Sequence, residues 1–295
     1  MRSMSVRKSG KATEVVESVE EMRGRVAGLR SSLRTIGLVP TMGALHEGHL
    51  SLIRAARREC EVVVVSLFVN RPQFGPAEDY DLYPRTWEED LGHCNSEQVD
   101  LVFSPPEKMI YPAGFSTWVD VERFSTVLEG AFRPDHFRGV STIVTQLFNV
   151  VTPDCAYFGQ KDYQQMLLIQ TMVKDLHIPI EIRACPIIRE SDGLACSSRN
   201  RYLKGRDRQC AVVLYRVLQL AKQRIGGDGC RDFGKICYEM KEMIETTPNC
   251  ETEYVEIVSP ETLQPVSPRD ESVLAVVAVR VGSTRLIDNQ RIHLG

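Results

Sequence analysis

The amino-acid sequence predicts an α/β protein, with a Rossmann-like doubly wound parallel sheet followed by a smaller α+β C-terminal domain. Short apolar runs alternate with helical patterns through the first part of the chain, which is the order of a parallel sheet. The run at 62–69 is almost continuous and β-branched, as expected of a central parallel strand. After Arg189 the pattern changes to two helical stretches and two β-rich runs. We therefore expect domains at 1–188 and 189–295.

The individual elements follow from the period of the apolar residues. Runs typical of buried strands occupy 36–39, 62–69, 99–103, 156–158 and 180–184. Helical spacing occupies 15–29, 47–56, 140–151 and 163–176, and Thr86-Trp87-Glu88-Glu89 resembles a capping box that begins another helix. In the second domain we expect helices at 207–224 and 230–246 and strands at 252–258 and 272–281.

Composition indicates a globular protein that acts on a small molecule. The 295 residues are 43% hydrophobic and carry a net charge of −3, so the chain can bury a sizeable core and has no overall attraction for nucleic acid or anionic membranes. An anionic substrate must then be bound by a local group of cations. No apolar run approaches the roughly 18 residues that a membrane span requires. We expect neither nucleic acid nor a membrane as a partner.

Cysteine usage and the N-terminus bear on the compartment. The nine cysteines are irregularly spaced and include no Cys-x-x-Cys pair, which favours reduced thiols over disulfides or a zinc site. We therefore expect a reducing, cytoplasmic location. Residues 1–13 are basic and contain no acidic residue, but they are too short for a typical transit peptide. We interpret them as a loose extension.

The segment 39–49, Val-Pro-Thr-Met-Gly-Ala-Leu-His-Glu-Gly-His, carries the clearest chemistry. It follows a predicted strand, at the edge where open α/β sheets bind ligands. Gly43 and Gly48 have the spacing of a P-loop, but His49 stands where that motif requires lysine. His46 and His49 lie on one face at the start of a predicted helix. The backbone N–H groups of a helix N-terminus attract phosphate. Two imidazole donors there can stabilise charge when a carboxylate displaces pyrophosphate. A metal pair or ordinary surface histidines are the alternative interpretations.

Five blocks of the sequence, in this order, resemble the pantothenate synthetase family. They are 40–49, Phe-Val-Asn-Arg-Pro-Gln-Phe at 68–74, Tyr-Pro-Arg-Thr at 83–86, Gly-Gln-Lys-Asp-Tyr-Gln-Gln at 159–165 and Asp-Gly-Leu-Ala-Cys-Ser-Ser-Arg-Asn at 192–200. The resemblance covers about 13–204 and continues weakly to the end. It implies an ATP-dependent ligase that condenses pantoate with β-alanine through a pantoyl adenylate and releases AMP and pyrophosphate. It also implies Mg²⁺ on the triphosphate, a lid formed by the second domain, and a homodimer.

The resemblance assigns roles residue by residue. It implies catalytic roles for His46, His49 and Lys161, with His49 at the position of a proton donor. The implied ATP-binding residues are Met42, Gly43, Ala44, Leu45, His46, Glu47, Gly48, His49, Gly159, Gln160, Lys161, Asp162, Ile188, Cys196, Ser197, Ser198 and Arg199. The implied residues for pantoate and β-alanine are Gln73, Gln165, Asn70 and His136, and Tyr83 and Glu129 also match pocket positions.

Three positions depart from the family pattern. Arg71 intervenes between the asparagine and the proline of the second block, Gln160 replaces a glutamate, and Cys196 stands where methionine is common. The first change can reshape the loop that carries Gln73. The third places a thiol at the site.

Other interpretations remain open at this point. The nearest is another nucleotidylyltransferase of the same superfamily, whose acceptor pocket would not need Gln73 and Gln165. A nucleotide sensor without catalysis, or an RNA-binding module on the same fold, is a second. Singly, Lys161 beside Asp162 is also explained as a surface ion pair. Four arginines, each taken singly, are also explained as solvated surface charge: Arg133, Arg138, Arg199 and Arg201.

Overall fold

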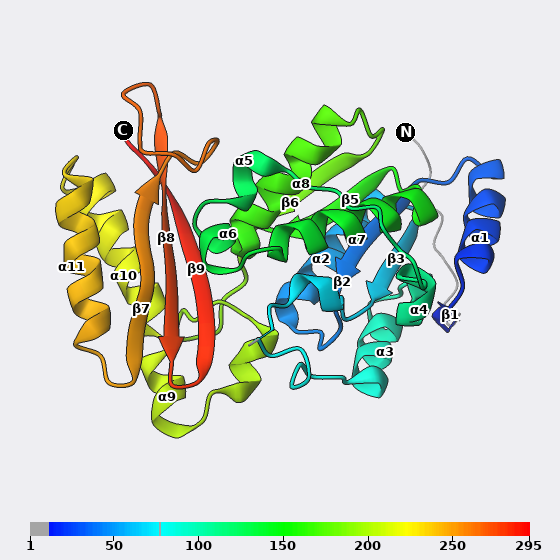
Figure 1. The fold of residues 1–295 in the computed structure, drawn as a ribbon, viewed down its shortest axis with the longest axis horizontal. Helices are drawn as coiled ribbons and strands as arrows, with labels where there is room; N and C mark the ends of the chain where they lie inside the picture. The colour runs from blue at the N-terminus through cyan, green and yellow to red at the C-terminus, as the bar shows by residue number, and fades with distance from the viewer. Residues whose placement is uncertain (1–11, 77) are drawn as a thin grey trace.

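The structure, a computed structural model, describes residues 12–76 and 78–295. The extension predicted at the N-terminus lies, apart from its last two residues, outside the described residues. Two sheets organise the chain, a six-stranded parallel sheet and a three-stranded antiparallel sheet (Figure 1). The predicted fold class, a Rossmann-like sheet with a smaller α+β unit after it, is confirmed.

The parallel sheet has the strand order β1-β4-β3-β2-β5-β6. Its strands are β1 (Glu14–Val16), β2 (Ile36–Thr41), β3 (Val62–Leu67), β4 (Leu101–Phe103), β5 (Cys155–Gly159) and β6 (Glu181–Cys185). The order reverses at β2, so the chain runs outward through β3 and β4 on one side and through β5 and β6 on the other. β2 and β5 are adjacent, and the crevice between their carboxyl ends is the place where such sheets bind ligands.

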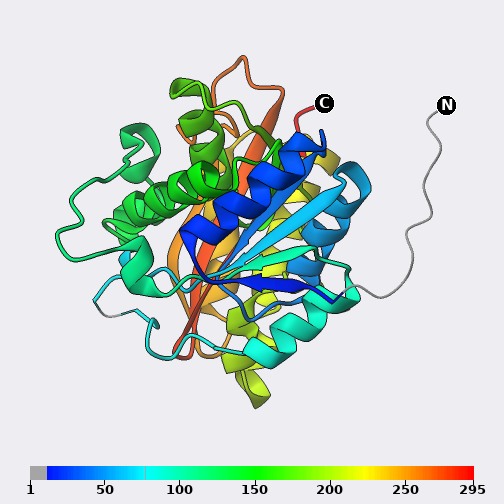
Figure 2. The same cartoon turned by 90° about the vertical axis from the view of Figure 1, so that its right-hand side faces the viewer.

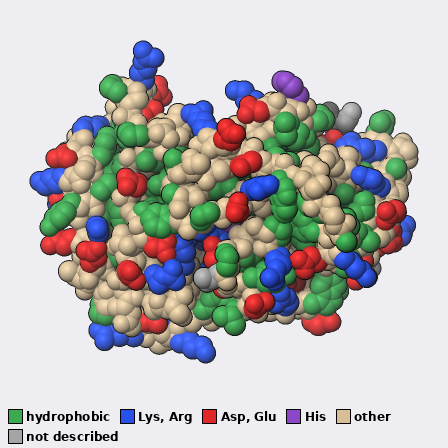
Figure 3. All heavy atoms as spheres, viewed as in Figure 1, with side chains coloured by type: hydrophobic (Ala, Val, Ile, Leu, Met, Phe, Trp, Pro, Cys, Tyr) green, Lys and Arg blue, Asp and Glu red, His purple; other side chains and the backbone are tan. Residues whose placement is uncertain are grey.

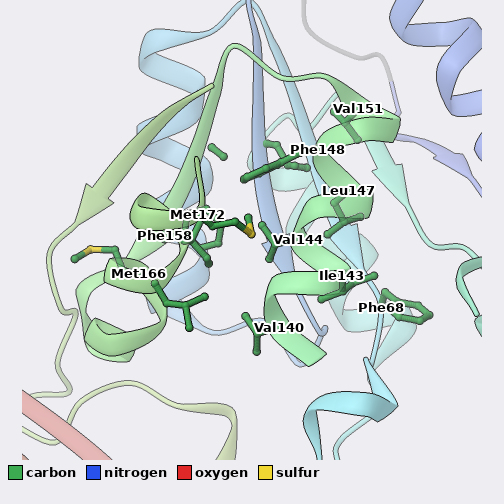
Figure 4. Packing of buried hydrophobic residues seen from close by; sticks show 14 of the residues in the cluster. Phe68, Val140, Ile143, Val144, Leu147, Phe148, Val151, Phe158, Met166 and Met172 are labelled. Carbon is green, nitrogen blue, oxygen red and sulfur yellow. The ribbon is translucent and has the colours of Figure 1, made fainter. Parts of the chain in front are cut away.

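Helices cover both faces of this sheet (Figure 2). The helices α1 (Val19–Ser31), α7 (His136–Val151) and α8 (Tyr163–Asp175) pack on one face, and α2 (Glu47–Glu59) and α3 (Trp87–Ser96) pack on the other. Figure 4 shows Val140, Val144 and Leu147 of α7 directed toward the side chains of β5 and α8. The spacing of these residues, one helical turn apart, places them on a single buried stripe.

Two local predictions need correction. The helical pattern expected over 15–29 includes Val15 and Val16, but both lie in β1, which pairs in parallel with β4. α1 begins only after Ser18, whose side chain accepts a hydrogen bond from the Glu21 N–H. The second correction concerns the predicted capping box. The helix α3 begins after Thr86 as expected, but the Thr86 side chain makes no capping hydrogen bond, and its hydroxyl donates to the Asp90 carboxylate instead.

The C-terminal part contains the antiparallel sheet and the helices that cover it. The sheet has the order β7 (Cys250–Val258), β8 (Ser272–Val281), β9 (Thr284–His293). The helices α10 (Val213–Lys222) and α11 (Phe233–Glu245) pack on its outer face, while β9 is the strand nearest the parallel sheet (Figure 1). The helix expected over 207–224 is interrupted, because α9 (Gly205–Cys210) ends before α10 begins at Val213. β9 was not predicted.

The remaining elements are short. They are η1 (Arg71–Gln73), α4 (Glu107–Ile110), α5 (Glu122–Ser125), α6 (Glu129–Phe132), η2 (Gln160–Asp162), η3 (Ser198–Tyr202), α9 (Gly205–Cys210) and η4 (Gln223–Gly227). None of the helices within the described ranges is both long and apolar enough to cross a bilayer. On the face shown in Figure 3, basic and acidic side chains are interspersed.

Candidate active site

A cavity of about 220 Å³ lies at the carboxyl ends of the central parallel strands. Pro40 and Thr41 at the end of β2, Phe158 and Gly159 at the end of β5, and the segment 186–188 after β6 contribute to its wall. The cavity therefore occupies the crevice that the strand order predicts as a binding site. It gathers residues from all five sequence blocks.

The loop after β2 is held by hydrogen bonds from a neighbouring helix. Ala44 adopts the left-handed conformation, with φ of 49°. The buried carboxylate of Asp90, on α3, accepts hydrogen bonds from the backbone N–H groups of Ala44 at 2.9 Å and Leu45 at 2.7 Å. These bonds satisfy two buried donors and fix the turn that leads into α2.

His46 and His49 face each other at the start of α2. Their ring centroids are 4.0 Å apart, and His46 is the N-cap residue, with its Nδ1 accepting a hydrogen bond from the Gly48 N–H at 3.1 Å. An Nδ1 that accepts leaves Nε2 as the atom that carries the proton in the neutral ring. The Nδ1 atom of His49 is buried and has no hydrogen-bond partner within the described part of the chain. Most buried polar atoms have a partner, so this nitrogen marks His49 as a candidate functional residue.

Both imidazoles are neutral in this environment. Burial, followed by the nearby His49 and by the cations Lys161 and Arg201, lowers the pKa of His46 to about 2. Burial, with a smaller contribution from Lys161 and against the opposing attraction of Asp162, lowers the pKa of His49 to about 4. Near pH 7 the pair therefore offers hydrogen bonds rather than positive charge.

Lys161 approaches the same cavity from the turn η2, after β5. Its ammonium lies 3.7 Å from a carboxylate oxygen of Asp162, and its side chain is 19% exposed. The interpretation of this pair as a surface ion pair does not fit, because both residues line the cavity. The turn itself is bound from the C-terminal sheet, since the Asn289 amide donates to the Gln160 and Lys161 carbonyls at 2.9 and 2.8 Å.

Amide side chains form another part of the cavity wall. The Asn70 Nδ2 donates to the Gln73 Oε1 at 3.0 Å, and the Gln73 Nε2 contacts the Met42 sulfur at 2.8 Å. His136 Nδ1 lies 2.7 Å from the Gln73 carbonyl oxygen, and burial followed by the charge of Arg133 lowers the His136 pKa to about 4. Gln165 lines the same cavity.

The arginines differ from one another in their surroundings. Arg133 lines the cavity, with a side chain only 11% exposed, and pairs with Glu78 at 2.6 Å, so its interpretation as solvated charge is wrong. Arg199 also lines the cavity and makes two hydrogen bonds to Asp79 at 2.8 and 2.9 Å. Arg138 and Arg201 are 43% and 39% exposed, in agreement with a solvated interpretation.

Most residues named from the sequence line the cavity. They are Met42, His46, Gly48, His49, Asn70, Gln73, Tyr83, His136, Gly159, Lys161, Asp162, Gln165, Ile188, Cys196, Ser197, Ser198 and Arg199. Those that do not are Gly43, Ala44, Leu45, Glu47, Gln160 and Glu129. Ala44 and Leu45 are buried with their N–H groups bound to Asp90, and Glu47 pairs with Arg54 on the surface.

Glu129 belongs to a buried charge network behind the cavity. Its carboxylate accepts two hydrogen bonds from Arg285, at 2.7 and 2.8 Å, and one from the Tyr254 hydroxyl at 2.7 Å. Burial opposes its charge, but the hydrogen bonds and charge of Arg285 outweigh burial and hold the Glu129 pKa at about 2. Glu129 thus connects the first sheet's helices to the C-terminal sheet.

Sequence reasoning missed several residues that shape the site. Asp90 lies within a predicted helix, and Asn289 lies in a strand that was not predicted. Each acts on a segment distant in sequence, so no local pattern signals it. For Arg133, the Phe-Arg-Pro sequence offers only an ambiguous signal.

The comparisons with known proteins agree with this geometry. The family model described as pantoate-beta-alanine ligase matches residues 14–291. Pantothenate synthetase of Caldicellulosiruptor saccharolyticus is 49% identical over 275 residues, covering 93% of this chain and 98% of that protein. Pantothenate synthetase of Thermotoga petrophila is 50% identical over 276 residues, covering 94% and 98%.

Two solved structures resemble the whole chain. The pantothenate synthetase of Thermus thermophilus has a TM-score of 0.89 and 44% identity, covering 94% of this chain and 99% of that one. Pantoate-beta-alanine ligase of Francisella tularensis, crystallised in a complex with β,γ-ATP and β-alanine, has a TM-score of 0.78 and 33% identity, covering 95% and 97%. The family match, the near-full-length relatives and the cavity with its paired histidines agree, and the chain belongs to the pantoate-β-alanine ligase family, the pantothenate synthetases.

Proposed function

We propose that the cavity binds ATP and pantoate and that the chain condenses pantoate with β-alanine through a pantoyl adenylate. The observation that carries the proposal is the pair of neutral imidazoles at the start of α2, which line one cavity together with Lys161; the Nδ1 of His49 is buried and has no partner among the described residues. The family match and the ATP and β-alanine complex of the Francisella relative support it. A different nucleotidylyl acceptor would not require the amide cluster around Gln73.

In the first step, the pantoate carboxylate attacks the α-phosphorus of ATP, and pyrophosphate leaves. The His46 Nε2–H and the His49 ring would donate hydrogen bonds to the phosphoryl oxygens, whose charge increases in the transition state. Lys161 would bind the departing phosphates as a compact cation. We assign catalytic roles to His46, His49 and Lys161. Burial sets the His49 pKa at about 4, and the negative charge of a bound triphosphate would raise it; the neutral ring also donates a hydrogen bond through one nitrogen.

We assign the nucleotide to the part of the cavity around the histidine pair and Lys161, and pantoate to the part around the amide side chains. Met42, Gly48, Gly159, Asp162, Ile188 and 196–199 would surround ATP, with Asp162 near the ribose. Gln73, Gln165, Asn70 and His136 would hold pantoate or β-alanine. The Gln73 amide supports this, because among the described residues its Nε2 donor contacts the weak thioether acceptor of Met42 and would bond more strongly to a hydroxyl or carboxylate.

Magnesium is a further component of the proposal. The described residues gather no group of three or more potential ligands, and Asp162 is the single carboxylate among the described lining residues. This donor set fits an ion that arrives on the triphosphate and retains waters, as Mg²⁺ commonly does. When bound, it would neutralise part of the triphosphate charge.

The second step needs a dry cavity. The β-alanine amine attacks the adenylate carbonyl, and AMP leaves; water would otherwise hydrolyse the adenylate. We propose that residues 189–295 form a lid domain over the binding domain at 1–188, that the enzyme is cytoplasmic, and that it forms a homodimer. A stable monomer in sedimentation at micromolar concentration would contradict the last of these.

Product analysis tests the proposed reaction. With pantoate, β-alanine, magnesium and ATP, the protein should form pantothenate and AMP in equal amounts, and no ADP. Omission of pantoate should abolish AMP formation. ADP as the nucleotide product would identify phosphoryl transfer and reject an adenylate. AMP formation with another acceptor, and none with pantoate, would support the rival nucleotidylyltransferase.

A further inference from the structure

The turn that carries Lys161 is bound by a residue from the opposite end of the chain. Asn289 lies on β9, and its amide nitrogen donates one hydrogen bond to the Gln160 carbonyl and one to the Lys161 carbonyl, at 2.9 and 2.8 Å. β9 is an edge strand of the C-terminal sheet, and the parallel sheet lies beside it (Figure 1). Asn289 thus lies on the edge of the C-terminal sheet and donates hydrogen bonds to two consecutive carbonyls beside the parallel sheet.

Asn289 is itself held rigidly. It is 5% exposed, and its backbone N–H donates to the Asp288 carboxylate at 2.8 Å. Asp288 is 3% exposed and receives two hydrogen bonds from Arg189, at 2.6 and 3.0 Å. Arg189 also bonds to the carbonyl of Asn289 at 3.3 Å and lies over the ring of Tyr215. The amide therefore projects from a strand with little freedom to move.

The turn η2 needs an outside contact of this kind. It is three residues long, and no other part of the chain packs within 4 Å of the place where a Cβ would stand on Gly159, the last residue of β5 before the turn. Within the described part of the chain, the Lys161 side chain makes one ion pair, with the adjacent Asp162 at 3.7 Å, which is too long for a strong hydrogen bond. The position of the ammonium consequently depends on the backbone of the turn, which Asn289 binds.

We propose that Asn289 is a positioning residue for Lys161, through which the C-terminal sheet sets the place of the catalytic ammonium. It acts through the Gln160 and Lys161 carbonyls and is not among the residues that line the cavity. The proposal rests on the proposed function, in which Lys161 stabilises the phosphates during adenylation. Displacement of a positioned group by about 1 Å costs up to on the order of a hundredfold in rate, so loss of two hydrogen bonds at this turn should be visible in kcat.

The proposal makes a specific prediction for paired substitutions. Asn289→Ala should lower kcat for pantoate-dependent AMP formation by on the order of tenfold and leave the KM for pantoate within about twofold, because an interaction made in the transition state is weakened. In a Lys161→Ala background, the same change should have little further effect on kcat, since the group that Asn289 positions is gone. Gln290→Ala is the matched control, because the Gln290 side chain bonds only to the adjacent Arg291 carbonyl in the described structure; it should behave as the wild type.

The outcomes separate this proposal from the proposed function. Equal additional losses from Asn289→Ala in the wild-type and Lys161→Ala backgrounds would overturn positioning through Lys161, and so would normal kcat in Asn289→Ala. If Asn289→Ala does not fold, Asn289→Ser keeps a polar side chain that is one atom too short to reach the two carbonyls, so its kcat should fall as well; a wild-type kcat in that variant would contradict the proposal. If the wild type itself forms no AMP with pantoate, the proposed function fails instead.

Discussion

At the residue scale, the site depends on imidazoles that burial keeps neutral. His46 has one ring nitrogen occupied by the Gly48 N–H, and His49 has one that is buried and has no partner among residues 12–76 and 78–295. Each ring can then present a donor toward the cavity without the cost of burying a charge. A lysine at either position would bring a full positive charge but would need water or a carboxylate beside it.

Replacement of either histidine should lower kcat strongly and preserve the fold. His46→Ala or His49→Ala should lower kcat by on the order of a hundredfold, the usual loss for one transition-state donor. Steady-state AMP formation measures the effect, and circular dichroism checks the fold. His93→Ala on α3 is the matched control, since His93 lies outside the cavity and only approaches Glu89, at 3.9 Å. Near-normal turnover in both site variants would reject the role of the pair.

Asp90 should matter for both stability and rate. Asp90→Asn replaces one of the two acceptor oxygens that hold the Ala44 and Leu45 N–H groups, and should cost about 1–3 kcal/mol in the free energy of unfolding. Because the loop leads into His46, kcat should also fall by on the order of tenfold. Urea unfolding and AMP formation measure the two effects. Glu88→Gln, on the exposed side of the same helix, should change neither; an equally stable and active Asp90→Asn would contradict this account.

At the element scale, α7 positions the amide cluster by close backbone contact. A Cβ at Gly139 would lie 2.6 Å from the Pro72 carbonyl and from the Gln73 nitrogen, so the helix and η1 touch where only glycine fits. Asn70 also donates to the Gly139 carbonyl, at 3.1 Å. The short helix that carries Gln73 is therefore seated directly on α7. Arg71 adjoins Pro72 at the start of η1, and the turn forms with both residues in place.

Gly139→Ala should push η1 away from α7. We expect a loss of about 1–3 kcal/mol in the free energy of unfolding, the usual range for overpacking, and an increased KM for pantoate as Gln73 moves. Chemical denaturation and initial rates measure these changes. Gly28→Ala is the matched control, because no atom lies within 4 Å of a Cβ there, and helix propensity should keep or slightly raise stability. An unchanged free energy of unfolding and an unchanged KM in Gly139→Ala would contradict this prediction, because the backbone contact between α7 and η1 would then relax without cost.

Elements with a strong local pattern were predicted, and those that depend on distant partners were not. The runs at 36–39 and 62–69 are β-branched and buried, so β2 and β3 were evident. β1 has three residues, and its valines merge with the helical period that follows. In β9, Asp288 and Asn289 are polar because they bind Arg189 and η2, and this obscures the strand pattern. The site residues in the motifs were predicted, whereas Asp90 and Asn289 become visible only when the fold brings them to their targets.

At the scale of the whole molecule, buried neutral histidines connect stability to pH. His136 is 8% exposed, and its pKa falls to about 4 mainly because of burial. Below its ordinary pKa of about 6.5 the unfolded chain binds a proton that the folded chain does not, so stability falls as pH decreases toward 4. His46 and His49 act in the same direction.

The histidine contribution can be measured by unfolding at two pH values. Between pH 7 and pH 5, His136 should account for a loss of about 1–2 kcal/mol in the free energy of unfolding. His136→Gln should reduce the pH dependence by that amount, even if it is less stable at pH 7. Urea unfolding of both proteins at each pH provides the comparison. The same slope in the variant and the wild type would contradict a buried, neutral His136.

Exchange of pyrophosphate into ATP tests the central claim most directly, because it reports adenylate formation alone. Radiolabelled pyrophosphate should enter ATP when pantoate and magnesium are present and β-alanine is absent, since the first step is complete and reversible before the amine is needed. The exchange should be lost without pantoate and should be slower by on the order of a hundredfold in His49→Ala. A well-folded protein that binds ATP but shows no pantoate-dependent exchange would contradict the claim.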